Sequence, residues 1–196
     1  AESGIVGAGI GAAMGGMHPM VELMTINFSF LAMDQIVNSA AKLHYMSNGQ
    51  VTSPLVIRMA SGGGSLLGAT HSHSLEGLYA HFPGLKVVCP ATPADAKGLL
   101  KQAFRDNNPI IFIEHTANYL IKGEVPDDPD YLVEFGQANV LREGTDVSLI
   151  GYSGSVHQAL RAATMLQDQE HISAEVIDLR TLRPLDIRSE ERRVGK

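Results

Sequence analysis

Three features of the sequence carry residue types that can do chemistry: an early acid, a glycine-rich stretch and a pair of histidines. Glu2 stands where the positive end of a helix would favour a carboxylate. Ser61–Ser65 reads Ser-Gly-Gly-Gly-Ser, and its backbone N–H groups could cradle a phosphate. The G-K-[ST] ending of a P-loop is missing, so an active-site loop is the better interpretation. His71 and His73 follow closely and are candidates for contact with a substrate.

The two histidines could also bind a metal, because alternate residues of an extended segment point to the same side. No spaced cysteine or acid completes a recognisable ligand set in the sequence, which argues against zinc. Cys89, between Val88 and Pro90, fits a small buried apolar residue better than a nucleophile. It is the only cysteine, which indicates a reducing compartment.

Gly7, Gly9 and Ala12 form a G-x-G-x-x-A pattern that resembles a dinucleotide fingerprint. That motif needs a preceding strand and an acid about 20 residues later. Only six residues precede Gly7, and Glu22 follows early, so an NAD-binding oxidoreductase stays as a competing hypothesis. The favoured alternative is a helix with a smooth glycine face that packs closely against another backbone, between subunits.

The elements that must position these residues alternate between strands and helices. Apolar runs predict strands at 20–24, 55–57, 86–89, 110–113, 147–150 and 174–179. Helices are predicted over 29–46, capped by Ser29, over 92–105, capped by Thr92 with Pro93 in its first turn, and between the last two strands. The pattern predicts an α/β fold with a mostly parallel sheet.

Composition narrows the function classes. The chain has 196 residues, is 44% hydrophobic and carries a formal net charge of −6, as ordinary globular proteins do. The acidic balance argues against nucleic acid as a partner. The longest uncharged stretch, residues 4–17, is shorter than a bilayer span of about 20 residues, so no membrane partner is expected.

A proline- and aspartate-containing stretch, residues 125–130, is the best candidate for a domain boundary. We predict a first domain over 1–115, a linker over 116–135 and the start of a second α/β domain over 136–187. The polar run 188–196 resembles a translated sequencing adaptor, and we expect it to be foreign. The chain does not begin with methionine, which suggests a fragment.

Seven segments keep a nearly constant spacing along the chain: 2–7, 22–28, 34–42, 71–73, 81–88, 105–109 and 177–186. Together they resemble the β subunit of the thiamine-diphosphate-dependent 2-oxo acid dehydrogenases, with pyruvate dehydrogenase β subunits the nearest match. The resemblance implies a transketolase-like pyrimidine-binding domain that lacks its N-terminal part, followed by a truncated C-terminal domain.

The resemblance also implies roles for individual residues. Glu2 falls on the family's glutamate that hydrogen-bonds N1′ of the aminopyrimidine, so that the cofactor acts as its own general base. Met24 and Phe28 fall where relatives flank the pyrimidine ring. His71 matches the active-site histidine expected to assist decarboxylation or acyl transfer to lipoamide. His73 stands where many relatives carry glutamine, which suggests a role in substrate choice or lipoyl docking.

Metal ions and partners follow from the same resemblance. A structural potassium ion would be held by oxygens of Leu55, Ala103, Asp106 and Asn108. The diphosphate and Mg²⁺ belong to an α subunit in an α2β2 heterotetramer, which delivers acyl groups to a lipoyl acyltransferase core. The expected substrate is the 2-oxo acid pyruvate, with branched-chain 2-oxo acid and acetoin dehydrogenase β subunits as alternatives. The expected location is the cytoplasm of a bacterium, or the mitochondrial matrix or plastid of a eukaryote.

Overall fold

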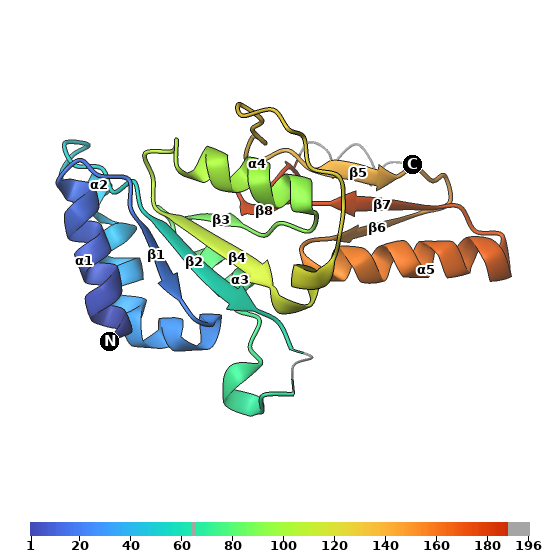
Figure 1. The fold of residues 1–196 in the computed structure, drawn as a ribbon, viewed down its shortest axis with the longest axis horizontal. Helices are drawn as coiled ribbons and strands as arrows, with labels where there is room; N and C mark the ends of the chain where they lie inside the picture. The colour runs from blue at the N-terminus through green and yellow to red at the C-terminus, as the bar shows by residue number, and fades with distance from the viewer. Residues whose placement is uncertain (64–65, 188–196) are drawn as a thin grey trace.

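A parallel sheet forms the centre of the first part of the chain. The computed structural model describes residues 1–63 and 66–187. Four parallel strands, β1 (Met20–Leu23), β2 (Val56–Ser61), β4 (Ile110–His115) and β3 (Lys86–Val88), lie side by side in the order β1-β2-β4-β3 (Figure 1). A late strand, β8 (Thr181–Arg183), pairs antiparallel with β3 at the edge. The end of the described chain therefore returns to the first sheet.

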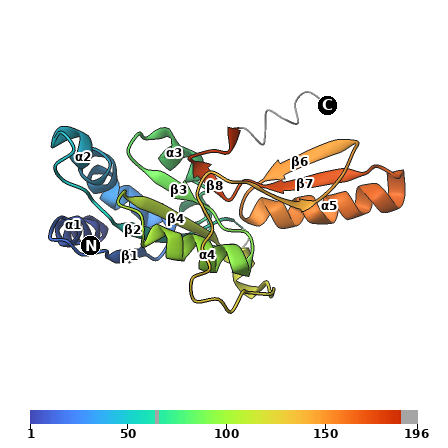
Figure 2. The ribbon, with the colours of Figure 1, turned by 90° about the horizontal axis from the view of Figure 1, so that it is seen from above.

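A second, three-stranded sheet has the order β5-β7-β6. Its strands are β5 (Asn139–Arg142), β6 (Val147–Gly151) and β7 (Ala174–Asp178), and β6 and β7 are parallel. Helix α5 (Gly154–Glu170) connects β6 to β7 and covers one face of this sheet (Figure 2). The β-α-β unit predicted from the sequence is confirmed, whereas the antiparallel strands β5 and β8 were not predicted.

Strand β4 shows why the first sheet is stable. Ile110, Ile111, Phe112 and Ile113 are all fully buried, because the sheet is covered on both faces, as the apolar run predicted. Ile111 and Ile113 pack with α1 (Glu2–Met14) and α3 (Glu76–His81), while Ile110 and Phe112 pack with α4 (Pro93–Ala103). Figure 2 shows α3 and α4 on opposite sides of the sheet.

The glycine-rich segment forms helix α1, and one of its glycines explains how closely it packs. A Cβ at Gly9 would lie 2.7 Å from Val21 Cγ1 and 3.0 Å from Leu55 Cδ1, so only glycine fits there. Gly4 and Gly11 have no described atom within 4 Å of a Cβ built on them. The smooth face that they form is therefore free of contacts with the rest of the described chain.

The predicted helix 29–46 is wrong. The segment forms a 3-10 helix (Ile26–Ala32), a π-helix (Gln35–Ala40) and the short α2 (Leu43–Met46). Thr25, rather than Ser29, is the N-cap, and its hydroxyl accepts a bond from the Asn27 backbone N–H. Ser29 is fully buried and donates a 2.5 Å hydrogen bond to the Ile26 carbonyl. The serine therefore links the turn internally, which sequence patterning alone does not distinguish from a cap.

The start of α4 agrees with the prediction. Thr92 accepts a hydrogen bond from the Asp95 backbone N–H at 3.1 Å, and Pro93 begins the helix. In the predicted linker, Tyr131 and Val133 pack against Gly98 of α4, where an added Cβ would lie 2.5 Å from Val133 Cγ2.

Every helix in ranges 1–63 and 66–187 is too short or too polar to cross a bilayer.

Candidate functional site

The functional candidates gather at the carboxyl edge of the first sheet. β1, β2 and β4 end at Leu23, Ser61 and His115, and ligands of open α/β sheets bind outside such strand ends. Helix α1 runs opposite to the strands, so Glu2 in its first turn lies at the same edge (Figure 1). The 3-10 helix 26–32 and the segment with the two histidines also lie there.

Glu2 and Met24 differ in exposure. The Glu2 side chain is 20% exposed, and its carboxylate lies 3.6 Å from the terminal ammonium of Ala1. Met24 directly follows β1 and is 78% exposed, an unusual state for a large apolar side chain. A largely covered acid and an open apolar side chain therefore lie at this edge.

Phe28 and Phe30 on the 3-10 helix each contact one of the two histidines. The rings of Phe28 and His71 meet edge to face with centroids 5.3 Å apart, and those of Phe30 and His73 meet in the same way at 5.9 Å. No local pattern predicts two separate aromatic partners for these histidines. The two imidazoles therefore have different aromatic neighbours.

The side chain of Asn27 links the cap residue Thr25 to the segment that carries His73. Its Oδ1 accepts a 3.1 Å hydrogen bond from the His73 backbone N–H, and its Nδ2 donates to Thr25 Oγ1 at 2.6 Å. His73 Nδ1 is buried and has no hydrogen-bond partner among the residues that the structure describes. Such an unpaired atom fits a contact with a group outside this chain.

His115 is a candidate that the sequence did not reveal. Its Nδ1 accepts the Ala117 backbone N–H at 3.2 Å, which leaves Nε2 to carry the proton of the neutral ring. The ring borders a cavity of about 300 Å³ together with Ser74, Glu76 and Ser153. The neighbouring strand β2 places Ser61 opposite His115, and no local sequence motif predicts this register.

Charged groups are buried where the two sheets meet. Asp95 is 1% exposed and forms a 2.7 Å ion pair with Arg180 Nη2. Asp178 is fully buried, and burial together with the charge of Asp95 raises its pKa to about 7, although a hydrogen bond from the Arg180 backbone N–H opposes the rise. Burial also raises the pKa of the Cys89 thiol, which agrees with its predicted role as an apolar core residue.

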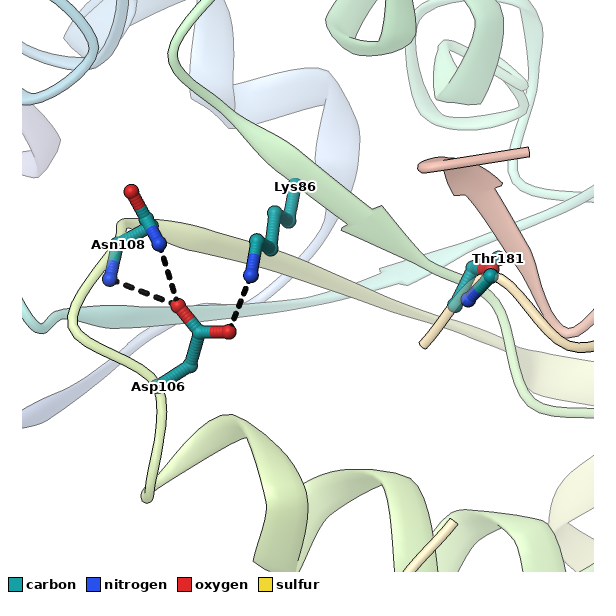
Figure 3. A network of polar contacts seen from close by, with 5 residues as sticks. Lys86, Asp106, Asn108 and Thr181 are labelled. Atoms are coloured by element: carbon teal, nitrogen blue, oxygen red, sulfur yellow. Dashed lines mark hydrogen bonds and ion pairs between the residues drawn. The ribbon is translucent and has the colours of Figure 1, made fainter. Parts of the chain in front are cut away.

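The four predicted potassium positions lie together at the opposite edge of the sheet. Asp106 Oδ1 accepts hydrogen bonds from the Asn108 backbone and side chain at 2.8 and 2.7 Å, and Oδ2 pairs with Lys86 (Figure 3). Burial opposes ionisation of Asp106, but these hydrogen bonds outweigh it and lower the pKa. The carbonyls of Leu55 and Ala103 accept backbone hydrogen bonds from Ile110 and Asp106.

These oxygens suit a hard cation chemically. An ion there would share Asp106 with the ammonium group of Lys86, so the potassium site stays a prediction. No group of three or more His, Cys, Asp or Glu side chains within the described part of the chain could hold a metal ion.

The structure does not support the dinucleotide fingerprint. Gly7, Gly9 and Ala12 all lie inside α1, which begins at Glu2, so the first glycine does not form a turn between a strand and a helix. Gly9 meets Val21 and Leu55 instead of facing open space for a pyrophosphate. Close packing explains Gly9, whereas Gly4 and Gly11 face no described atom.

Comparison with known families decides the relationship. The family described as "Transketolase, pyrimidine binding domain" matches residues 1–122. The chain belongs to this transketolase family. The transketolase C-terminal domain matches residues 136–196. A solved structure, "Split gene transketolase, inactive beta4 tetramer", superposes on this transketolase-like chain with a TM-score of 0.76 at 27% identity, covering 95% of this chain and 57% of the other.

Curated relatives of this transketolase-like chain carry three related names. The β subunit of acetoin:2,6-dichlorophenolindophenol oxidoreductase from Cupriavidus necator is 53% identical over 95% of the chain and 54% of the relative. The 2-oxoisovalerate dehydrogenase β subunit of Bacillus subtilis is 51% identical over 95% and 57%. The pyruvate dehydrogenase E1 β subunit of Rhizobium meliloti is 48% identical over 95% and 40%. The chain thus spans about half the length of these relatives.

Proposed function

We propose that this chain is part of the β subunit of a thiamine-diphosphate-dependent 2-oxo acid dehydrogenase and supplies the pyrimidine half of its active site. One observation carries the proposal: the first turn of α1, the exposed Met24 and the Phe28–His71 pair lie at the same edge of the first sheet. All three groups of relatives are β subunits of oxidoreductases, which supports the class. An NAD-binding oxidoreductase is not favoured, since α1 lacks the turn that the fingerprint requires.

The residues at this edge fit the cofactor. Met24 is exposed enough to pack on a ring, and Phe28 presents an aromatic side chain four residues later. Bound thiamine diphosphate would supply the electron sink for decarboxylation. Glu2 would hydrogen-bond the ring nitrogen N1′ and hold the proton there, while Met24 and Phe28 flank the ring. His71, fixed by Phe28, would hold or move a proton near the substrate.

The partners follow from the same proposal. An α subunit would bind the diphosphate and Mg²⁺, and an α2β2 assembly would pass the acyl group to a lipoyl acyltransferase core. The cytoplasm, or the matrix or plastid of a eukaryote, would be the site of action. The family resemblance and the names of the relatives support these partners.

The substrate needs a direct test because acetoin, 2-oxoisovalerate and pyruvate enzymes are similarly close in sequence. We propose pyruvate. The full-length subunit, assembled with its α partner, should be assayed for thiamine-diphosphate-dependent turnover of all three compounds at equal concentration. The highest kcat/KM for pyruvate supports the proposal. A preference for 2-oxoisovalerate or acetoin would leave the class intact and replace the substrate, and no thiamine dependence with any of them would refute the class.

A further inference from the structure

The imidazole of His115 is enclosed by two glycines that lie far apart in the sequence. A Cβ at Gly62 would lie 2.3 Å from His115 Nε2, and one at Gly154 would lie 2.7 Å from His115 Cδ2. Real Cβ atoms do not approach other atoms so closely. His115 and a side chain at either glycine therefore exclude each other.

The two glycines are required for different reasons. Gly62 follows β2 with a φ of +95°, a conformation that other residues adopt only with strain. Gly154 begins α5 and has no positive φ, so its backbone would accept alanine. The three atoms nearest to a Cβ at Gly154 all belong to the His115 ring. The need for glycine at the start of α5 thus comes from His115.

The contact continues from His115 to the segment 66–73, which we call the histidine segment. Gly63 comes next after Gly62, and a Cβ there would lie 4.0 Å from the carbonyl oxygen of Ser72. Ser72 Oγ in turn donates a 2.9 Å hydrogen bond to the Gly68 carbonyl. The backbone at Gly62 and Gly63 therefore lies between His115 and the histidine segment.

Apart from the two glycines, the ring has one hydrogen bond, in which its Nδ1 accepts the Ala117 N–H. His115 also lines two cavities of about 190 and 300 Å³. A ring displaced by a larger residue at 154 has space to move. A Gly154→Ala variant is therefore expected to fold with His115 shifted.

We propose that His115 is a positioning residue that transmits the position of the α5 N-terminus, through Gly62 and Gly63, to the histidine segment and so to His71. The functional part of this inference rests on the proposed role of His71. The structural part, the link from Gly154 to Ser72, does not depend on any bound cofactor.

The test is a double-mutant cycle of Gly154→Ala and His115→Ala in the full-length subunit assembled with its α partner. Gly77→Ala is the matched control, since Gly77 lies in α3 with no described atom within 4 Å of an added Cβ. Backbone hydrogen exchange of the histidine segment is the first readout and needs no cofactor. Each single variant should raise this exchange about tenfold, because local support is lost, and Gly77→Ala should not.

The double variant decides between a steric link and separate effects. With His115 removed, Gly154→Ala has nothing to displace, so exchange in the double variant should equal that of His115→Ala. The second readout is the split between kcat and KM. We expect kcat of the single variants to fall roughly ten- to hundredfold, as for a catalytic group moved by about 1 Å, with the KM for thiamine diphosphate unchanged.

Three results would overturn the inference: wild-type exchange in both single variants, effects that add in the double variant, or an unchanged kcat. If Gly154→Ala does not fold, the His115→Ala variant alone still tests the link. Wild-type exchange of the histidine segment in that variant would refute it. If no variant and no wild-type assembly decarboxylates a 2-oxo acid, the proposed function fails, and the exchange data still judge the positioning role.

Discussion

Asn27 connects the two parts of the candidate site with a single side chain. It is 8% exposed, accepts the His73 N–H and donates to Thr25, so it joins the end of β1 to the histidine segment. The resemblance directed attention to Phe28 and His71 but not to Asn27, which directly precedes Phe28. Its role depends on a contact across 46 positions of sequence.

Replacing Asn27 by alanine removes that connection. The variant leaves the partly buried His73 N–H without its acceptor, and we expect a loss of about 1 kcal/mol in the free energy of unfolding. Chemical denaturation of the full-length subunit measures it. Asn38→Ala is the control, because Asn38 donates an exposed bond to Asp34 and its loss should cost much less. Equal losses in both variants would show that the His73 bond is not important for stability.

Asp178 makes stability depend on pH. Its pKa in the folded chain, about 7, lies above the ordinary value near 4, because of burial and the nearby Asp95. The folded state therefore binds the proton more tightly, and the stabilisation present below pH 4 is lost as the pH rises to 7. Arg180 and Cys89 are the other titratable groups that face it.

Asp178→Asn keeps an acceptor for the Arg180 N–H but cannot ionise. Its stability relative to the wild type should rise between pH 4 and pH 7 by a few kcal/mol, at about 1.4 kcal/mol for each unit of pKa shift, and level off above. Thermal unfolding of both proteins across this pH range is the measurement. A difference that stays constant from pH 4 to pH 8 would mean that Asp178 titrates normally.

At the scale of elements, the helix α1 has one glycine that the chain itself requires and others that it does not. Gly9→Ala places a methyl group against Val21 and the fully buried Leu55, which should cost about 1–3 kcal/mol of stability. Gly11→Ala lies on the open face of the same helix and should gain up to about 1 kcal/mol from helix propensity. Denaturation curves of the two variants should therefore shift in opposite directions, and a shift of both in one direction would contradict this packing.

The open face of α1 also allows a test of assembly. If this face packs against another subunit, Gly11→Ala should weaken the heterotetramer while the separate subunit becomes no less stable. Sedimentation of the reconstituted complex over a concentration series reports this. Unchanged association would show that the glycine face is not at a subunit contact.

Element boundaries show what the sequence could and could not predict. The strands followed from apolar runs, since β4 is buried on both faces, and α4 followed from Thr92 and Pro93. The prediction for the segment 26–46 failed because Ser29 matches the sequence pattern of a helix cap, whereas in the structure its hydroxyl bonds to the Ile26 carbonyl within a tight turn. Strands β5 and β8 were not predicted because each is a short edge strand, and its pairing depends on the tertiary fold.

For the whole molecule, the fold brings the residues selected by resemblance to one edge of the first sheet, namely Glu2, Met24, Phe28 and His71, and their roles stay a proposal. The contact of His115 with Gly62 and Gly154 was not predictable, because it needs two units of the chain to meet. The buried pair Asp95–Arg180 holds the second sheet against the first, and it joins residues 85 positions apart in the sequence. No local pattern reports a charge pair of that kind.

We propose that Glu2 activates bound thiamine diphosphate. The most direct test is the exchange of the cofactor's C2 proton with solvent deuterium in the assembled full-length complex, followed by NMR for the wild type and for Glu2→Gln. Loss of the carboxylate should slow exchange about 10²- to 10⁴-fold, as expected when a general acid–base group is removed, with bound cofactor verified in both. Equal exchange rates in the two complexes would contradict the assignment of Glu2 and, with it, the proposed active site.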